Sequence, residues 1–65
     1  NILARPLIEL APRLCAALAP RGDIVLAGIL DHQAAEVVDA FAPWCEWGEP
    51  ARREGWTRLH GQKDR

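Results

Sequence analysis

The chain has 65 residues, 49% of them hydrophobic, and a formal net charge of −1 at pH 7. A chain of this length forms one small domain at most. The near-neutral charge favours neither direct nucleic-acid binding nor attachment to an acidic membrane surface. No apolar stretch approaches the roughly 20 residues that span a bilayer. The composition therefore predicts a globular domain outside the membrane.

The first residues predict the exposed end of a buried strand. Asn1-Ile2-Leu3 has no initiator methionine before it, so we expect the chain to be the back half of an α/β domain. A helix follows from Pro6, because apolar residues recur at helical spacing. These residues are Leu7, Leu10, Ala11, Leu14 and Leu18. Pro12 predicts a kink in this helix, or a restart close to it.

A short apolar run, Ile24-Val25-Leu26-Ala27, predicts a strand buried on both faces, and Gly28 ends it. Asp31 is a good N-cap for a second helix. Its buried stripe is predicted to comprise Ala34, Val37, Val38 and Phe41. Pro43 closes this helix.

Two strands are expected at 44–49 and 56–61, since both segments carry aromatic or β-branched residues. Residues 50–55 form a polar connector whose length suits an antiparallel hairpin. The element order predicts a parallel βαβ unit that ends in an antiparallel hairpin. The three tryptophans, Trp44, Trp47 and Trp56, are interpreted as sheet-packing residues, with contact to a substrate as the alternative.

Two strand ends carry the candidate site residues. Open α/β sheets bind their ligands at the carboxyl ends of their strands. Asn1 and Gly28-Ile29-Leu30 stand at such ends. The backbone of Gly28, Ile29 and Leu30 is a weak candidate for lining a substrate channel, and a tight turn at Gly28 is the alternative. Asn1 is the stronger candidate; a strand-end residue that caps a turn is the alternative.

The metal-ligating residue types are dispersed. Cys15, His32, Cys45 and His60 lack the close, paired spacing of metal ligands, so no metal site is predicted. The two cysteines are interpreted as reduced thiols of a cytoplasmic protein, and nothing supports a disulfide between them. His32 is interpreted as solvated, with a general base as the alternative, and His60 as structural or exposed.

Seven segments, in order and at matching spacing, carry a resemblance to a known family. They are Asn1-Ile2-Leu3, Pro6-Leu7, Glu9-Leu10-Ala11-Pro12, Gly28-Ile29-Leu30, Gln33-Ala34, Ala42-Pro43-Trp44 and Arg53-Glu54-Gly55-Trp56. Together they resemble the C-terminal part of the PrmA family, which methylates large-subunit ribosomal protein eleven. The similarity covers nearly all of residues 1–65.

The resemblance implies the C-terminal half of a class I, Rossmann-like, seven-stranded methyltransferase fold that uses S-adenosyl-L-methionine. In that fold the last strand inserts antiparallel between the penultimate strand and its neighbour. The resemblance also implies methylation of lysine side chains and of the N-terminal amine of the ribosomal protein. Asn1 matches the family's cofactor-contacting asparagine. The residues after it, Ile2 and Leu3, lack an aromatic ring for stacking, which fits an aliphatic amine acceptor.

The family's glycine-rich cofactor loop does not occur in this sequence, so we expect the chain alone to be inactive. Arg52-Arg53-Glu54 is interpreted as a solvated loop, with contact to ribosomal RNA or protein as the alternative. A different hypothesis is a non-catalytic α/β interaction module that self-associates through an exposed strand edge. Half of a dinucleotide-dependent oxidoreductase is a third, disfavoured by the antiparallel hairpin.

Overall fold

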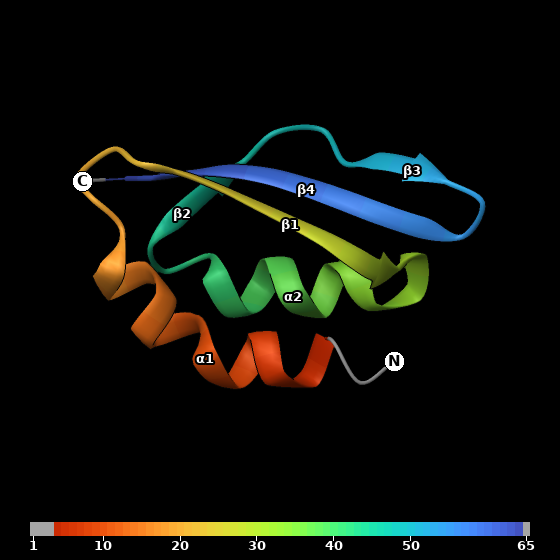
Figure 1. Ribbon diagram of the computed structural model, residues 1–65, viewed down its shortest axis with the longest axis horizontal. Coiled ribbons are helices and arrows are strands. Elements are labelled where there is room, and N and C mark those ends of the chain that lie inside the picture. The colour runs from red at the N-terminus through yellow and green to blue at the C-terminus, as the bar shows by residue number, and fades with distance from the viewer. Residues whose placement is uncertain (1–3, 65) are drawn as a thin grey trace.

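The computed structural model describes residues 4–64 as two helices packed on one face of a four-stranded sheet (Figure 1). No helix among these residues is long and apolar enough to cross a membrane. The elements in chain order are α1 (Ala4–Ala17), β1 (Asp23–Leu30), the 3-10 helix η1 (Asp31–Gln33), α2 (Ala34–Phe41), β2 (Cys45–Trp47), β3 (Ala51–Arg53) and β4 (Trp56–Lys63).

Strand β4 organises the sheet. It pairs antiparallel with β1 on one side, and with β2 and β3 on the other. Because β1 and β2 both run opposite to β4, they point in the same direction, and β4 lies between them. The antiparallel ending predicted from the sequence is confirmed. The parallel pairing is not found among residues 4–64, where every pairing is antiparallel, and its expected first strand, residues 1–3, lies outside the described residues.

Helix α1 is continuous and contains Pro12, so the predicted restart is wrong. The helix also begins before Pro6, at Ala4. Figure 1 shows the ribbon of α1 changing direction partway along its length, as the alternative prediction of a kink requires. Pro12 lies on the exposed side of the helix, where water can bond the carbonyl that the proline leaves without a donor.

The core lies between the helices and the inner face of the sheet. Its largest fully buried side chains include Phe41, Ile29, Leu59 and Val37. The predicted apolar stripe of α1 is largely confirmed, since Ala11 is buried and Leu7, Leu14 and Leu18 pack partly buried against the core. Leu10 is the exception and is 41% exposed.

The turn after β1 differs from the prediction. Gly28 does not end the strand; it adopts φ 75° inside a β-bulge between Leu26 and Ile29, and the strand continues to Leu30. A bulge needs an extra residue, and glycine takes positive φ without steric cost. Asp31 is not an N-cap either. It is the first residue of η1, and Leu30 precedes that helix as its cap.

The connector expected at 50–55 is also different, because part of it is strand β3. Arg53 pairs with Trp56, so only Glu54 and Gly55 form the turn. Both have positive φ, 52° and 85°, as a tight type I′ hairpin requires. Glycine is suited to this conformation and glutamate is not, which hid the turn from sequence reasoning.

The three tryptophans differ in their burial. Trp44 and Trp47 pack partly buried against the core, as predicted, and the Trp47 ring meets Phe41 edge to face with centroids 5.7 Å apart. Trp56 does not pack in the core, because the alternation along β4 turns it to the outer face, where it is 47% exposed.

The two cysteines meet in the core although 30 positions separate them in the chain. Both thiols are free and buried, as the sequence reasoning expected, and their sulfur atoms lie 3.8 Å apart. Burial raises the pKa of the Cys15 thiol to about 11, with further contributions from the hydrogen bond and the charge of Cys45, while Lys63 opposes the shift. The ionised thiolate is therefore disfavoured in the folded chain.

This shift predicts a loss of stability in alkali. An unfolded Cys15 ionises near its ordinary pKa of 9.0, but the folded one near 11, so the unfolded state releases its proton first. We expect the free energy of unfolding contributed by Cys15 to be intact below pH 9 and to fall between pH 9 and 11, by at most about 1.4 kcal/mol per pH unit. Urea unfolding followed by tryptophan fluorescence at successive pH values measures this. The Cys15→Ala variant should show a shallower decline, and an identical decline would contradict the assignment.

Candidate functional site

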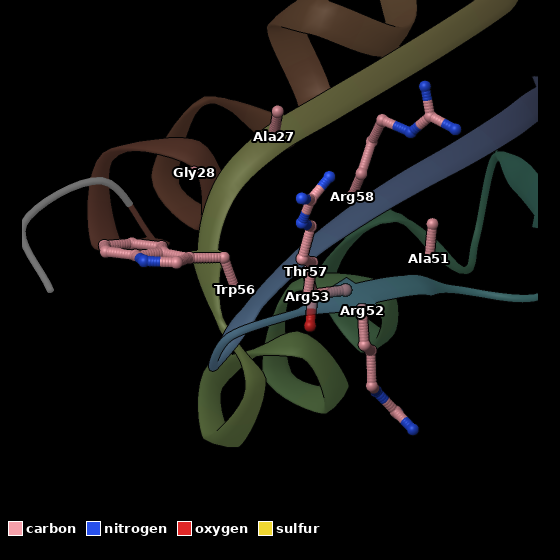
Figure 2. A pocket seen from close by; sticks show the side chains of 8 residues that line it. All are labelled: Ala27, Gly28, Ala51, Arg52, Arg53, Trp56, Thr57 and Arg58. Atoms are coloured by element: carbon pink, nitrogen blue, oxygen red, sulfur yellow. The ribbon is translucent and has the colours of Figure 1, made fainter.

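A cavity of about 430 Å³ opens at the end of the sheet where β1 finishes and β4 begins (Figure 2). The cavity therefore lies at the carboxyl end of β1, the kind of position where open α/β sheets bind ligands, while β2 ends farther along β4, opposite Gly61. The lining residues come from β1, β3 and β4. They are Ala27, Gly28, Ala51, Arg52, Arg53, Trp56, Thr57 and Arg58.

The β3–β4 hairpin places the side chains of the cavity. Directly paired residues share one face of a sheet, so Arg53 lies beside its partner Trp56, and Arg58 beside Ala51. Figure 2 shows the side chains of Arg53 and Arg58 pointing to one side of the hairpin and that of Arg52 pointing to the other. The alternation of β4 sends Thr57 inward, where it is 2% exposed.

A set of hydrogen bonds ties the turn after β1 to this hairpin. The Thr57 hydroxyl donates to the Asp31 carboxylate, and the Asp31 backbone N–H donates to the Gly55 carbonyl at 2.9 Å. The Leu30 N–H donates to Gln33 Oε1 at 3.3 Å. The first two bonds join the end of β1 to the hairpin at the start of β4, and the third closes the turn itself.

The cavity is positively charged. Three of its lining residues are arginines. Within residues 4–64 the only salt bridge joins His60 to Asp23 at 3.3 Å, and both side chains are exposed, so this pair contributes little stability. The guanidinium groups of the cavity therefore face solvent with no carboxylate of the described chain paired to them.

The predicted site residues are distributed unevenly. Asn1 lies outside the described residues. Gly28 lines the cavity, whereas the Ile29 side chain is fully buried in the core and Leu30, the last residue of β1, is half-buried. The role of their backbone in lining a substrate channel stays a prediction. His32 and His60 are exposed, and the described part of the chain holds no group of three side chains suited to a metal ion.

Sequence reasoning missed Trp56, Arg53 and Arg58 as members of one site. The period-two spacing of Trp56 and Arg58 indicates a shared strand face. Their proximity to Arg53 follows only from the two-residue turn, which the sequence did not reveal.

S-adenosylmethionine does not fit this cavity. Its sulfonium centre is a cation, and the described lining supplies guanidinium groups without a carboxylate to offset their charge. The same charge suits an anionic ligand. The described lining therefore fits a negatively charged group better than the sulfonium centre of the cofactor.

Comparison with known proteins supports the resemblance. The family model described as ribosomal protein L11 methyltransferase (PrmA) matches residues 1–64. A curated ribosomal protein L11 methyltransferase of Marinobacter nauticus is 54% identical over 63 residues, which cover 97% of this chain and 21% of that protein. Proteins of the same name from Bordetella parapertussis and Cellvibrio japonicus are each 49% identical to this chain. The match to the Bordetella protein covers 97% of this chain and 20% of that protein, and the match to the Cellvibrio protein covers 100% of this chain and 22% of that protein.

The chain thus spans about a fifth of the length of the curated relatives it matches. The match runs through both helices and all four strands of the described fold. A fold related to that of methyltransferases is expected on these grounds, and the order of β1, β4 and β2 agrees with it. This chain belongs to the PrmA family of ribosomal protein L11 methyltransferases.

Proposed function

We propose that this chain is the part of a ribosomal-protein methyltransferase that forms the acceptor side of the active site. The methyl group would pass from S-adenosyl-L-methionine to amino groups, lysine side chains and the N-terminal amine, of ribosomal protein L11. The proposal is supported by the family match, together with the position of the cavity at the carboxyl end of β1. The whole domain would be a class I, seven-stranded methyltransferase fold in the cytoplasm.

The chemistry of methyl transfer defines what the acceptor side of the active site must do. The sulfonium methyl group is already activated, so the protein positions the partners and excludes water. The acceptor amine must be neutral, and a free lysine, with a pKa of about 10.4, is mostly protonated at pH 7. A site that shields the acceptor amine from water disfavours the ammonium form and lowers that pKa, so desolvation of the amine is part of catalysis.

Asn1 is the proposed contact to the cofactor. An amide side chain accepts and donates hydrogen bonds without burying a charge. In the sequence, Asn1 precedes Ala4, the first residue of α1, by three positions. The backbone of Gly28, in the bulge of β1, and of Ile29 and Leu30 is the proposed lining of the acceptor channel.

A chimera tests the proposal. The 63 matching residues of the Marinobacter nauticus relative are replaced by the corresponding part of this chain. We expect the chimera to methylate purified ribosomal protein L11 with tritiated S-adenosylmethionine, and this chain alone to transfer no label and to bind the cofactor no better than millimolar. Micromolar binding by the chain alone would contradict the second expectation.

The Asn1→Ala variant of the chimera separates a site residue from a structural one. We expect a loss of about 100-fold in kcat/KM, as for loss of one positioned hydrogen-bonding group in an active site. Gln62→Ala is the matched control, because this exposed amide donates to the Arg21 carbonyl far along the sheet from the cavity. Equal losses in the two variants would remove Asn1 from the site.

The alternative, a non-catalytic interaction module, predicts an inactive but folded chimera. It also predicts that this chain self-associates through a strand edge. Sedimentation of the chain as a clean monomer at high concentration, together with an active chimera, would exclude it.

A further inference from the structure

We propose that the cavity between β1, β3 and β4 binds an acidic side chain, aspartate or glutamate, of the acceptor protein. The inference rests on the proposed function only in taking the partner to be a protein substrate. Arg53 and Arg58 would pair with the carboxylate, and Trp56 would pack against the neighbouring part of the peptide. The cavity thereby becomes a docking point that fixes the register of the acceptor segment.

The geometry of the hairpin carries the first step. Arg53 pairs with Trp56 and Ala51 with Arg58, so the two arginines are diagonal neighbours on one face. Side chains in that relation start about 7–8 Å apart. Two long guanidinium side chains at this separation can close on one carboxylate from both sides, and Figure 2 shows both directed to the same side.

The charges of the described residues carry the second step. No salt bridge within residues 4–64 involves Arg53 or Arg58, although Glu54 follows Arg53 directly. Glu54 is exposed and is the first of the two residues that form the turn. The guanidinium groups are thus available, and arginine with carboxylate gives short, bidentate hydrogen bonds.

The third observation is the exposed indole ring of Trp56. Trp56 is 47% exposed and lines the cavity together with the small residues Ala27 and Gly28. An exposed indole is a frequent anchor in protein interfaces, because it buries a large apolar area. A carboxylate on one side and an apolar stem on the other match a glutamate and its neighbour in a peptide.

The rest of this sheet face argues for a short acidic segment over RNA. A nucleic-acid strand needs positive charge along several phosphates. Beyond the cavity, the same face carries the exposed carboxylates of Asp23 and Glu46, on either side of Gln62. A polyanion following the sheet would meet them within a few residues, whereas a single carboxylate would not.

Peptide binding by this chain is the direct test. The probes are a fluorescein-labelled peptide with two glutamates, the same peptide with glutamines, and an oligouridylate of about twelve nucleotides. We expect anisotropy to detect the glutamate peptide at low salt, with the glutamine peptide and the oligouridylate each at least about tenfold weaker. The Arg53→Gln/Arg58→Gln double variant should lose at least about tenfold, and Trp56→Ala several-fold with an unchanged salt dependence.

The matched control is Arg13→Gln, which removes an exposed arginine from α1, on the other side of the sheet. It should bind as the unaltered chain does, and circular dichroism should show each variant folded. Equal binding of the two peptides, an equal loss in Arg13→Gln, or no binding at all would overturn the inference. Tighter binding of the oligouridylate would assign the surface to RNA instead.

The chimera distinguishes this inference from the proposed function. In an active chimera, the double arginine variant should raise KM for ribosomal protein L11 about tenfold and leave kcat within about twofold. An active chimera with unchanged KM would refute the docking role and leave the methyltransferase function standing. An inactive chimera that still binds the glutamate peptide would refute the methyltransferase function and leave the docking role standing.

Discussion

Replacing Phe41 by alanine is expected to leave most of the chain unfolded at 25 °C. Phe41 is fully buried at the end of α2, and its ring contacts Trp47 edge to face at 5.7 Å between centroids. Truncating a buried phenylalanine costs about 3–5 kcal/mol, because the transfer free energy and the cavity both count. A single core in a chain of this size supplies roughly 3–5 kcal/mol in total, so the loss is comparable to the whole stability.

Urea unfolding followed by far-ultraviolet circular dichroism measures this effect. Phe41→Leu keeps most of the volume and should cost no more than about 1.5 kcal/mol. Leu10→Ala serves as a control on an exposed position, where 41% of the residue is accessible, and should change stability by about 0.5 kcal/mol. A Phe41→Ala variant as stable as the Leu10→Ala variant would show that the core is not centred on this ring.

Gly61→Ala is expected to destabilise the chain by about 1–3 kcal/mol through overpacking. A methyl group on Gly61 would lie 2.6 Å from Cε3 and 2.8 Å from Cζ3 of Trp47. The ring cannot move aside freely, because it packs against Phe41 and β2 pairs directly with β4 at this position. The substitution therefore strains the contact between the central strand and its neighbour.

Gly48→Ala is the matched control for this prediction. A methyl group there would have the His60 carbonyl oxygen as its only close neighbour, at 3.8 Å, which is ordinary contact. Thermal unfolding of the two variants should show a clear decrease in melting temperature for Gly61→Ala alone. Combining Gly61→Ala with Trp47→Leu should recover part of the loss, since the smaller side chain relieves the overlap. Additive losses in the double variant would place the strain elsewhere.

The helices and the last strand were predictable because their signals are local. The apolar stripe of α1 and that of α2 recur at helical spacing, and both become buried faces. The alternation of β4, with Thr57 and Leu59 inward, follows the two-residue period of a strand. Pro12 misled the prediction of a restart, because its effect depends on which side of the helix faces water.

The turns were not predictable, since each depends on contacts with a distant segment. Gly28 was expected to end its strand, but the pairing of β1 with β4 continues beyond it and makes it a bulge. Aspartate is a residue type that favours N-caps, yet the carboxylate of Asp31 accepts a hydrogen bond from the Thr57 hydroxyl of the neighbouring strand. In both cases a long-range partner overrode the local preference.

The candidate site was likewise predictable only in part. Periodicity and family resemblance together indicated an α/β chain of the methyltransferase type, and they drew attention to the segment around Gly28. Both kinds of signal depend on residues that are close in sequence. Only the tertiary structure brought Arg53 and Arg58 beside Trp56 and Gly28, since that arrangement requires a two-residue turn and the insertion of β4 between β1 and β2. The physical reason is that strand pairing joins residues far apart in the chain, and one shift in register would send the arginines to the opposite face.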